Sequence, residues 1–302
     1  MTSISMKKIA ILSLCILNAT FLFAQDDLLK MAMTDSVPKK EFVSATFKTT
    51  KVINAQTNET VYKRTLDFRV GHRFGNMGKY TDGKSAAHTL YGLDASTDIR
   101  IAFEYGITND LTVGFSRSKM KENLEGLVKY RILKQTTNNK MPIAVTFFGN
   151  AAFTPQKDNA GIFDKTTRRF NYVAQLIIAR KFNSWISLEV LPTFNHRNYV
   201  FDNLDENDIF ALGGAARVRI TRSTCIVADY FYNFSQYRLD RTDSYYNPLG
   251  LGFEIETGGH VFSIMFTNSA GIIENEFIPY TTDSWSDGGI KFSFNISRNF
   301  RM

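Results

Sequence analysis

Charged side chains recur at every second position in several segments. These side chains are the first candidates for chemistry, because their spacing brings them together on one face. In TLDFRVGHRFG, residues 65–75, Asp67, Arg69 and Arg73 alternate with apolar residues. Alternate residues of an extended chain point to opposite faces, so these charges share one face. A face that carries both signs can form ion pairs, or it can bind a carboxylate or phosphate through its arginines.

The charges that fall on this face in all segments are balanced, with eight of each sign. The basic members are Arg69, Arg73, Arg100, Lys129, Arg131, Arg217, Arg219 and Lys291, and the acidic members are Asp67, Asp98, Glu104, Glu125, Glu189, Asp229, Glu254 and Glu256. An isolated buried charge is costly, so charges that share an enclosed space should pair. Two interpretations stay open: a salt-bridged, largely closed interior, or a narrow polar pore.

The first three arginines of this face could gather into one cluster that binds an anion. Equally, Arg69, Arg73 and Arg100 could simply neutralise the neighbouring carboxylates Asp67, Asp98 and Glu104. Both interpretations require the segments around residues 65–75 and 97–106 to be neighbours.

Catalytic and metal-binding patterns are missing from the sequence. The four histidines, His72, His88, His196 and His260, stand at segment ends or in a long polar link, without a nucleophile at close spacing. DNLDEND, residues 202–208, clusters carboxylates but lacks the glycine and the terminal glutamate of a hand-type calcium loop. We therefore expect no enzyme, no cofactor and no dedicated metal site.

The elements that must position the charges are alternating segments of strand character. Their lengths suit a tilted strand that crosses a bilayer, which needs roughly 9 to 11 residues. We expect twelve, at residues 63–74, 97–106, 110–118, 123–133, 141–152, 167–180, 184–196, 207–220, 224–235, 248–256, 260–268 and 288–300. Long polar links alternate with short ones that carry turn-forming residues, as in an up-and-down membrane barrel.

The faces opposite the charges are apolar, and their environment decides the fold. In a large exported β-sandwich they would form the core, whereas in a membrane barrel they would face lipid. The regular alternation of long and short links favours an all-β, antiparallel, up-and-down transmembrane β-barrel of about twelve strands. Val173, Ile177, Val261 and Met265 interrupt the polar face, and we expect them to pack inside the barrel.

The N-terminal region has the features of an export signal. A basic stretch, Met6-Lys7-Lys8, precedes an apolar run, which predicts a signal peptide over 1–24 and a mature chain that begins near Gln25. Residues 25–62 would form an N-terminal periplasmic extension or a plug, and residues 63–302 the outer-membrane barrel. Cys225 would be the only cysteine of the mature chain, which excludes an internal disulfide framework and argues against a zinc site.

Several short motifs are similar to a known family. HRFG at 72–75, YGLD at 91–94, LTVGFSRS at 111–118 and KY at 129–130 resemble a family of Bacteroidetes β-barrel proteins, catalogued as domain of unknown function 5777. The resemblance extends from about Phe42 to the C-terminus, and it implies an outer-membrane barrel without an assigned activity. The chain departs from the general pattern of such barrels because it ends Phe300-Arg301-Met302 and not on an aromatic residue.

These features predict an outer-membrane barrel that acts as a narrow passive or gated pore, or that binds a small ligand. The alternative is a sealed structural or docking barrel that presents its extracellular loops to another envelope protein. The expected partners are outer-membrane lipid and either a small polar solute or an envelope protein. The basic residues form no long block, so we expect no nucleic-acid partner.

Overall fold

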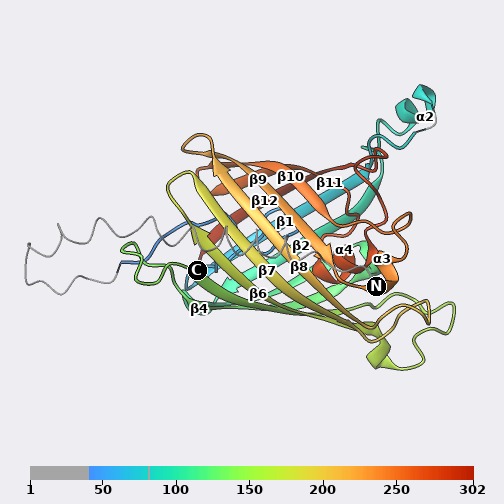
Figure 1. Cartoon of the computed structure of the whole chain (residues 1–302), viewed down its shortest axis with the longest axis horizontal. Coiled ribbons are helices and arrows are strands. Elements are labelled where there is room, and N and C mark those ends of the chain that lie inside the picture. The colour runs from blue at the N-terminus through green and yellow to red at the C-terminus, as the bar shows by residue number, and fades with distance from the viewer. Residues whose placement is uncertain (1–40, 81) are drawn as a thin grey trace, which may run out of the picture. The chain divides into compact units, whose positions relative to one another are not determined.

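The computed structural model describes residues 41–80 and 82–302, so the predicted signal peptide and residues 25–40 lie outside the described residues. The described chain forms a closed barrel of twelve antiparallel strands, each paired with its neighbours in sequence, and β1 closes against β12 (Figure 1). The strands are β1 Thr65–Asn76, β2 Ser96–Gly106, β3 Leu111–Ser118, β4 Leu124–Leu133, β5 Ala144–Phe153, β6 Phe170–Lys181, β7 Ile186–Arg197, β8 Asp208–Arg219, β9 Thr224–Asn233, β10 Leu249–Thr257, β11 His260–Thr267 and β12 Lys291–Arg301. The predicted fold class is confirmed.

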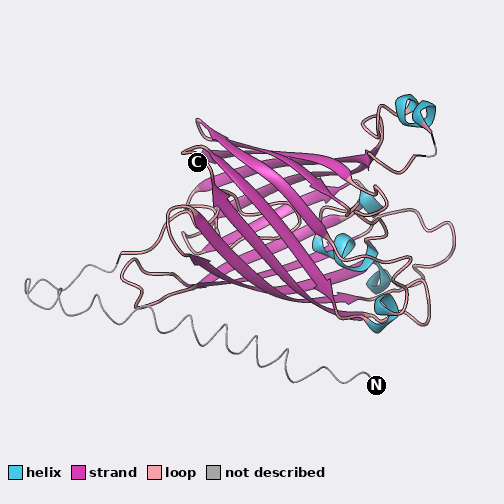
Figure 2. Ribbon diagram, turned by 45° about the horizontal axis from the view of Figure 1, so that its top comes forward, coloured by secondary structure: helices cyan, strands magenta, loops and turns pink. Residues whose placement is uncertain are grey.

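The two ends of the barrel differ in the links that they carry. One end, here called the short-turn end, has the links 107–110, 134–143, 182–185, 220–223 and 258–259. The other, the long-loop end, carries the helices, which gather there in Figure 2: α2 Gly83–His88, η3 Met120–Glu122, η4 Thr166–Arg169, α3 Gln236–Leu239 and α4 Glu274–Tyr280. Among the described residues, none of these helices has the length and apolar character that a membrane crossing requires.

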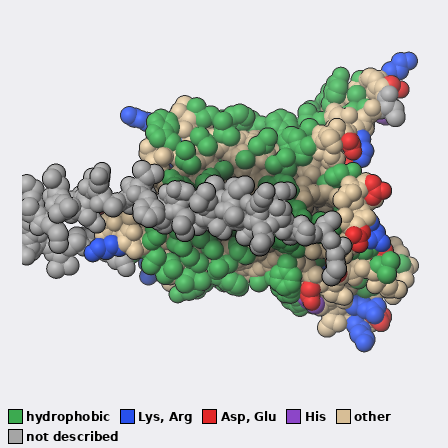
Figure 3. Space-filling model, viewed as in Figure 1, with side chains coloured by type: hydrophobic (Ala, Val, Ile, Leu, Met, Phe, Trp, Pro, Cys, Tyr) green, Lys and Arg blue, Asp and Glu red, His purple; other side chains and the backbone are tan. Residues whose placement is uncertain are grey.

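The alternation along each strand separates an apolar outside from a polar inside. Burial alternates residue by residue along β1, with Asp67 and Arg69 buried. On β2, Phe103 points outward and is 44% exposed, whereas its neighbours Ala102 and Glu104 are buried. Figure 3 shows hydrophobic side chains over much of the visible side of the barrel, with charged side chains toward its ends. The outside is therefore suited to acyl chains, and the inside to polar contacts.

The interior is occupied by a segment that precedes β1. Residues 46–61, here called the inner segment, are buried almost throughout. The chain approaches at the short-turn end, where Phe42 bridges Thr136, and it leaves at the same end, where Lys63 bridges Gly106. Between these points it doubles back, with hydrogen bonds from the Val52 N–H to the Ala55 carbonyl and from the Thr57 N–H to the Thr50 carbonyl, both 2.9 Å.

A second segment enters the interior from the opposite end. Residues 268–281 of the β11–β12 link, here called the inward loop, are buried apart from partial exposure at Ala270 and Tyr280. This loop includes α4, which packs against β6 and β7. The barrel is thus filled from both ends by parts of its own chain.

Candidate functional site

One side of the lumen, formed by β1–β4, is lined with buried ionisable groups. We call this set the charged wall: Asp67, Arg69, Arg73, Asp98, Arg100, Glu104, Glu125 and Lys129. Arg69 pairs with Asp67 at 2.9 Å, and Arg100 pairs with Glu125 at 2.7 Å. Ser116 and Asn150 donate further hydrogen bonds to the Glu125 carboxylate. Arg69 and Arg100 each neutralise one carboxylate, whereas Arg73 donates to backbone carbonyls and to the Asn54 side chain, so the three arginines do not gather into a single anion site.

Cations of the charged wall also hold the backbone of the inner segment. Lys129 Nζ donates to the carbonyls of Thr50 and Thr57, at 2.7 and 3.1 Å. Arg69 Nη1 donates to the Lys51 carbonyl at 3.2 Å, and Arg73 Nη2 donates to the Ile53 carbonyl at 3.2 Å. These charge-assisted bonds satisfy carbonyls that would otherwise be buried without partners.

Carboxylates on other strands also bind the inner segment, by accepting hydrogen bonds from its backbone N–H groups. Asp229 on β9 accepts the N–H groups of Asn54 and Ala55, at 2.5 and 2.8 Å, and the Asn54 side-chain amide at 2.9 Å. Glu189 on β7 accepts the N–H of Asn58 at 3.3 Å. The strands therefore bind both the carbonyl groups and the N–H groups of the inner segment's backbone, in addition to contacts of its side chains.

The inner segment and the inward loop meet inside the barrel. Lys51 of the inner segment forms a buried ion pair with Glu274 of α4, and the Gln56 side chain donates to the same carboxylate at 3.2 Å. Arg73 contacts both segments, since it also donates to the Ser269 carbonyl at 3.3 Å and to the Gly271 carbonyl. Asp98 accepts the Ile272 N–H at 2.9 Å. A displacement of either segment would therefore disturb the contacts of the other.

The opposite side of the lumen, on β5–β9, carries large apolar side chains. We call this set the apolar wall: Phe148, Val173, Ile177, Leu191, Ile209 and Phe231. Phe277 of α4 lies edge-on to Phe231, with ring centroids 5.0 Å apart. Phe47, Val52 and Ile53 of the inner segment belong to the same buried cluster. The predicted inward packing is confirmed for Val173, Ile177 and Met265, whereas Val261 is only half-buried at the short-turn end.

The sixteen charged residues predicted to share the inner face differ in burial and position. Thirteen are buried: Asp67, Arg69, Arg73, Asp98, Arg100, Glu104, Glu125, Lys129, Glu189, Arg217, Asp229, Glu254 and Lys291. Arg131 is half-buried, with hydrogen bonds to the Asn58 carbonyl and the Glu59 carboxylate. Arg219 and Glu256 lie at the short-turn rim, where Arg219 stacks on Trp185 at 5.3 Å and Glu256 pairs with Lys48.

Sequence reasoning missed the functional residues that lie outside the strands. Lys51, Glu274 and Glu276 are buried and paired, but they occupy irregular segments in which no period of two marks them. The only available signal was that two carboxylates flank Asn275 within an otherwise apolar stretch, IIENEFIP. Among the described residues, no group of three or more histidine, cysteine, aspartate or glutamate side chains could hold a metal ion.

A further cluster joins three links at the long-loop end. Asp205 accepts hydrogen bonds from Arg197 at 2.8 and 3.0 Å and from Arg238 at 2.7 and 3.0 Å. Arg197 also donates to the Tyr280 hydroxyl at 3.2 Å. Burial alone would raise the pKa of Asp205, but the hydrogen bonds from the two arginines outweigh it and lower that pKa. This cluster fastens the ends of β7 and β9 to the inward loop.

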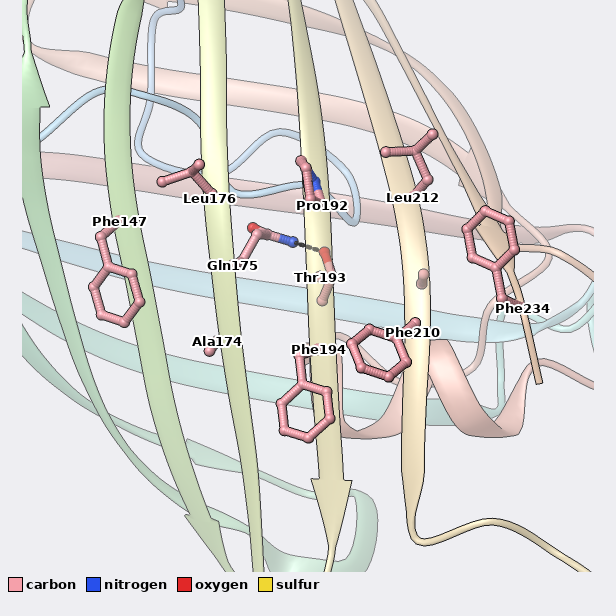
Figure 4. A pocket seen from close by; sticks show the side chains of 11 residues that line it. Phe147, Ala174, Gln175, Leu176, Pro192, Thr193, Phe194, Phe210, Leu212 and Phe234 are labelled. Carbon is pink, nitrogen blue, oxygen red and sulfur yellow. Dashed lines mark hydrogen bonds between the residues drawn. The ribbon is translucent and has the colours of Figure 1, made fainter.

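A cavity of about 480 Å³ lies on the outer face and not in the lumen (Figure 4). Its walls are apolar: Phe147, Leu176, Phe194, Phe210, Leu212 and Phe234. Ala174 and Pro192 form the floor, and their small side chains leave room for the hollow. At the same place the β6–β7 register has no pairs opposite Leu191 and Pro192. Gln175 and Thr193 bond to each other at 2.7 Å. This hollow faces the lipid side, so it is not part of a solute path.

The comparison with known protein families agrees with the architecture. Residues 47–300 match a family described as a membrane-bound β-barrel domain, domain of unknown function 5777. No match is found among curated proteins. Among solved structures, the chain is similar to KdgM porin, with 8% identity, a TM-score of 0.47, and coverage of 78% of this chain and 99% of that chain. It is also similar to an outer membrane channel from Pseudomonas putida F1, with 10% identity, a TM-score of 0.44, and coverage of 80% and 98%.

Proposed function

Because the chain belongs to the family of membrane-bound β-barrel domains, domain of unknown function 5777, we propose that it is a gated conduit for small polar solutes and not an enzyme. The chain lies in the outer membrane, and in barrels of this topology the short turns face the periplasm. The inner segment would be the periplasmic gate, and the inward loop would be the extracellular one. In the state described here both gates are closed.

The observation that carries this proposal is the way in which the charged wall holds the inner segment. Lys129, Arg69 and Arg73 bind backbone carbonyls, and Asp229 binds backbone N–H groups. Water can replace each of these bonds when the segment leaves, because the wall groups are charged and readily hydrated. The wall would then line an aqueous path without a buried unpaired charge. The same charges thus serve the closed state, in which they bind the backbone of the segment, and an open state, in which they bind water.

The lumen lining also predicts which solutes would pass. The balance of the two signs along the strands argues against strong selectivity for anions or cations. Twelve strands enclose a space between the filled interior of eight-stranded barrels and the open channel of porins with about sixteen strands. We therefore expect passage of small hydrophilic solutes once the inner segment has moved, with size as the main criterion.

Single-channel recording in planar bilayers tests the gate with a reversible lock. An ideal Cβ on Gly250 would lie 3.0 Å from the Ile53 Cβ and 2.7 Å from Asp229 Oδ1. The Cβ atoms of a disulfide are roughly 3.5–4.5 Å apart, so a small outward shift of the inner segment would both relieve these contacts and allow the bond. We would combine Ile53→Cys and Gly250→Cys with Cys225→Ser, which removes the buried native thiol. The oxidised variant should be silent, and reduction should restore steps like those of the unlocked protein. Steps of equal frequency before and after reduction would contradict gating by the inner segment.

Deletion of residues 41–62 supplies the complementary measurement. The deletion variant should conduct continuously, provided that it still migrates as a folded barrel without heating. A deletion variant that folds but does not conduct would show that the inward loop alone closes the lumen. The inner segment would then have no part in the mechanism.

A second candidate function, a sealed docking barrel, is favoured by one observation. Phe47 and Ile53 of the inner segment share a buried apolar cluster with Phe277 of the inward loop and with the apolar wall. Such a core resists exchange with water, because each buried side chain contributes about 1.5–3 kcal/mol. This function would be favoured over a conduit if none of three proteins conducted: the wild type, the reduced lock variant and the folded deletion variant.

A further inference from the structure

We propose that the polar cavity at the short-turn end is a binding site for a small solute that carries an ammonium group and hydroxyl groups, such as an amino sugar. The cavity holds about 210 Å³, the share of about seven waters at roughly 30 Å³ each. The inner segment forms one side of it, and β1, β12 and the β10–β11 hairpin form the other. The identification of a site rests on the cavity itself, and only its effect on gating rests on the proposed function.

An unused carboxylate oxygen gives the cavity its preference for a positive solute. Asp67 lines the cavity and is only 5% exposed. Its Oδ2 atom accepts from Arg69 at 2.9 Å, whereas Oδ1 has no hydrogen-bond partner among the described residues. A buried acceptor without a partner is costly, and an ammonium or hydroxyl donor from a solute would remove that cost.

All three carboxylates of the cavity are paired, but only Asp67 keeps a buried oxygen without a partner among the described residues, which makes it the recognition group. Glu256 pairs with Lys48, so these two charges cancel. Glu59 accepts the N–H groups of Thr46 and Phe47, at 2.8 and 3.3 Å, and also pairs with Arg131. Each of the three acidic groups of the lining therefore has a cation beside it, and the preference for a positive solute rests on the free Oδ1 acceptor of Asp67. A carboxylate of an anionic solute could only place a second acceptor against that oxygen, which is unfavourable.

The remaining lining suits a ring with hydroxyl groups. Ser297 and Asn299 on β12 stand opposite Arg69 and Asp67 in the β1–β12 register, and both line the cavity. Thr49 and Thr60 add hydroxyl groups from the inner segment, and Phe47 and Val261 supply an apolar surface. A few polar groups above an apolar patch are the usual composition of a small-molecule site.

Binding at this cavity would hold the conduit closed. The inner segment contributes part of the lining, so the complete site exists only while that segment occupies the lumen. A solute that binds one of two states shifts the population toward that state. A periplasmic amino sugar would therefore lower the opening frequency.

Calorimetric titration of the full-length protein in detergent tests the site without reference to conductance. The probes are glucosamine, glucose and glucuronate, which share a ring and differ in charge, at a mildly acidic pH at which the amine is protonated. Glucosamine should bind at least tenfold more tightly than glucose, and glucuronate should not bind. Equal affinity for all three probes, or no binding of glucosamine to the wild type, would overturn the proposal.

Variants at the rim identify the group responsible. Asp67→Asn should weaken glucosamine binding at least tenfold and leave glucose binding nearly unchanged. The matched control is Asp110→Asn, since Asp110 lies in a short-turn link and pairs with Lys134 outside the cavity lining. Val261→Phe should block all probes by filling the cavity, and it tests the site without altering the Asp67–Arg69 pair. A loss with Asp110→Asn equal to that with Asp67→Asn would assign the effect to surface charge.

Planar bilayers then separate the site from its effect on gating. Glucosamine on the periplasmic side should reduce the openings of the wild type and not those of Asp67→Asn. Binding without any conductance in either protein would retain the site and reject the conduit. Conductance without binding would reject the site alone.

Discussion

The two walls of the lumen hold the same inner segment by different physical means. The charged wall uses hydrogen bonds from Lys129, Arg69 and Arg73 to backbone carbonyls. The apolar wall uses burial, and it joins Ile53 of the inner segment and Phe277 of the inward loop in one cluster. Hydrogen bonds to the wall can be exchanged for bonds to water, whereas apolar contacts are lost when water enters. We therefore expect opening to begin along the charged wall, with the apolar wall as the anchor.

The largest expected effect comes from placing a charge on the apolar wall. Ile177→Asp would bury a carboxylate without a cation beside it, and it should destabilise the barrel by more than about 3 kcal/mol. Most of the protein should then fail to fold. On a gel run without heating, little of it should migrate as the folded barrel. Ile177→Val is the matched control, with a cost of about 0.5–1.5 kcal/mol. Equal yields of folded protein from both variants would contradict an apolar anchor.

The next largest effect is expected from a buried ion pair of the charged wall. Glu125→Ala leaves Arg100 buried without its partner, so the free energy of unfolding should fall by about 3 kcal/mol. Denaturant titration in detergent measures this change. Arg117→Ala removes a pair with Glu122 at 3.7 Å that is exposed to solvent, and it should cost at most about 1 kcal/mol. Similar losses for the two variants would mean that the charged wall is already hydrated in the closed state.

A smaller effect should appear in gating. Lys129→Met removes two hydrogen bonds to the inner segment, and a bond to a charged group is worth about 1.5–3 kcal/mol. The opening frequency in bilayers should rise by about tenfold or more, since about 1.4 kcal/mol corresponds to a factor of ten.

Lys181→Met is the matched control for that gating measurement. Lys181 donates to the Ser44 carbonyl at 2.8 Å, just before the buried inner segment begins, so its loss should change the opening frequency little. An equal rise for both variants would show that opening does not begin at the charged wall.

The smallest effect is expected from acid at the long-loop end. The lowered pKa of Asp205 means that its pairs with Arg197 and Arg238 stabilise the closed loops above about pH 4, the ordinary aspartate range. This stabilisation is lost as the pH falls through the lowered pKa. Hydrogen exchange of residues 198–207 should therefore accelerate in acid for the wild type.

Asp205→Asn should exchange fast at neutral pH and respond little to acid, whereas Asp243→Asn, in the β9–β10 link, should behave as the wild type. Acid acceleration of the same size in Asp205→Asn would assign the effect to other carboxylates.

The strands and the faces could be predicted from the sequence because both depend on local geometry. A residue such as Phe103 or Glu104 points outward or inward according to its place in a period of two, whatever lies across the barrel. The ends of the strands were predicted to within a few residues, as with β1, expected at 63–74 and found at Thr65–Asn76.

The ion-pair partners could not be predicted in the same way. Arg100 on β2 reaches across β3 to Glu125 on β4, although Glu104 lies on its own strand. That choice depends on the tilt and stagger of strands in the closed barrel, which a single strand does not encode.

By itself, the sequence determined a barrel with an apolar outside and an inside that carries balanced charges. The alternation of apolar and polar residues and the lengths of the links are local features of the chain, so both can be seen in the sequence. Only the tertiary structure decided what fills that inside. Lys51 and Glu274 are more than two hundred positions apart, and they meet because two irregular segments enter the lumen from opposite ends. No local pattern marks such a contact, because it is created by the enclosure of the chain within its own barrel.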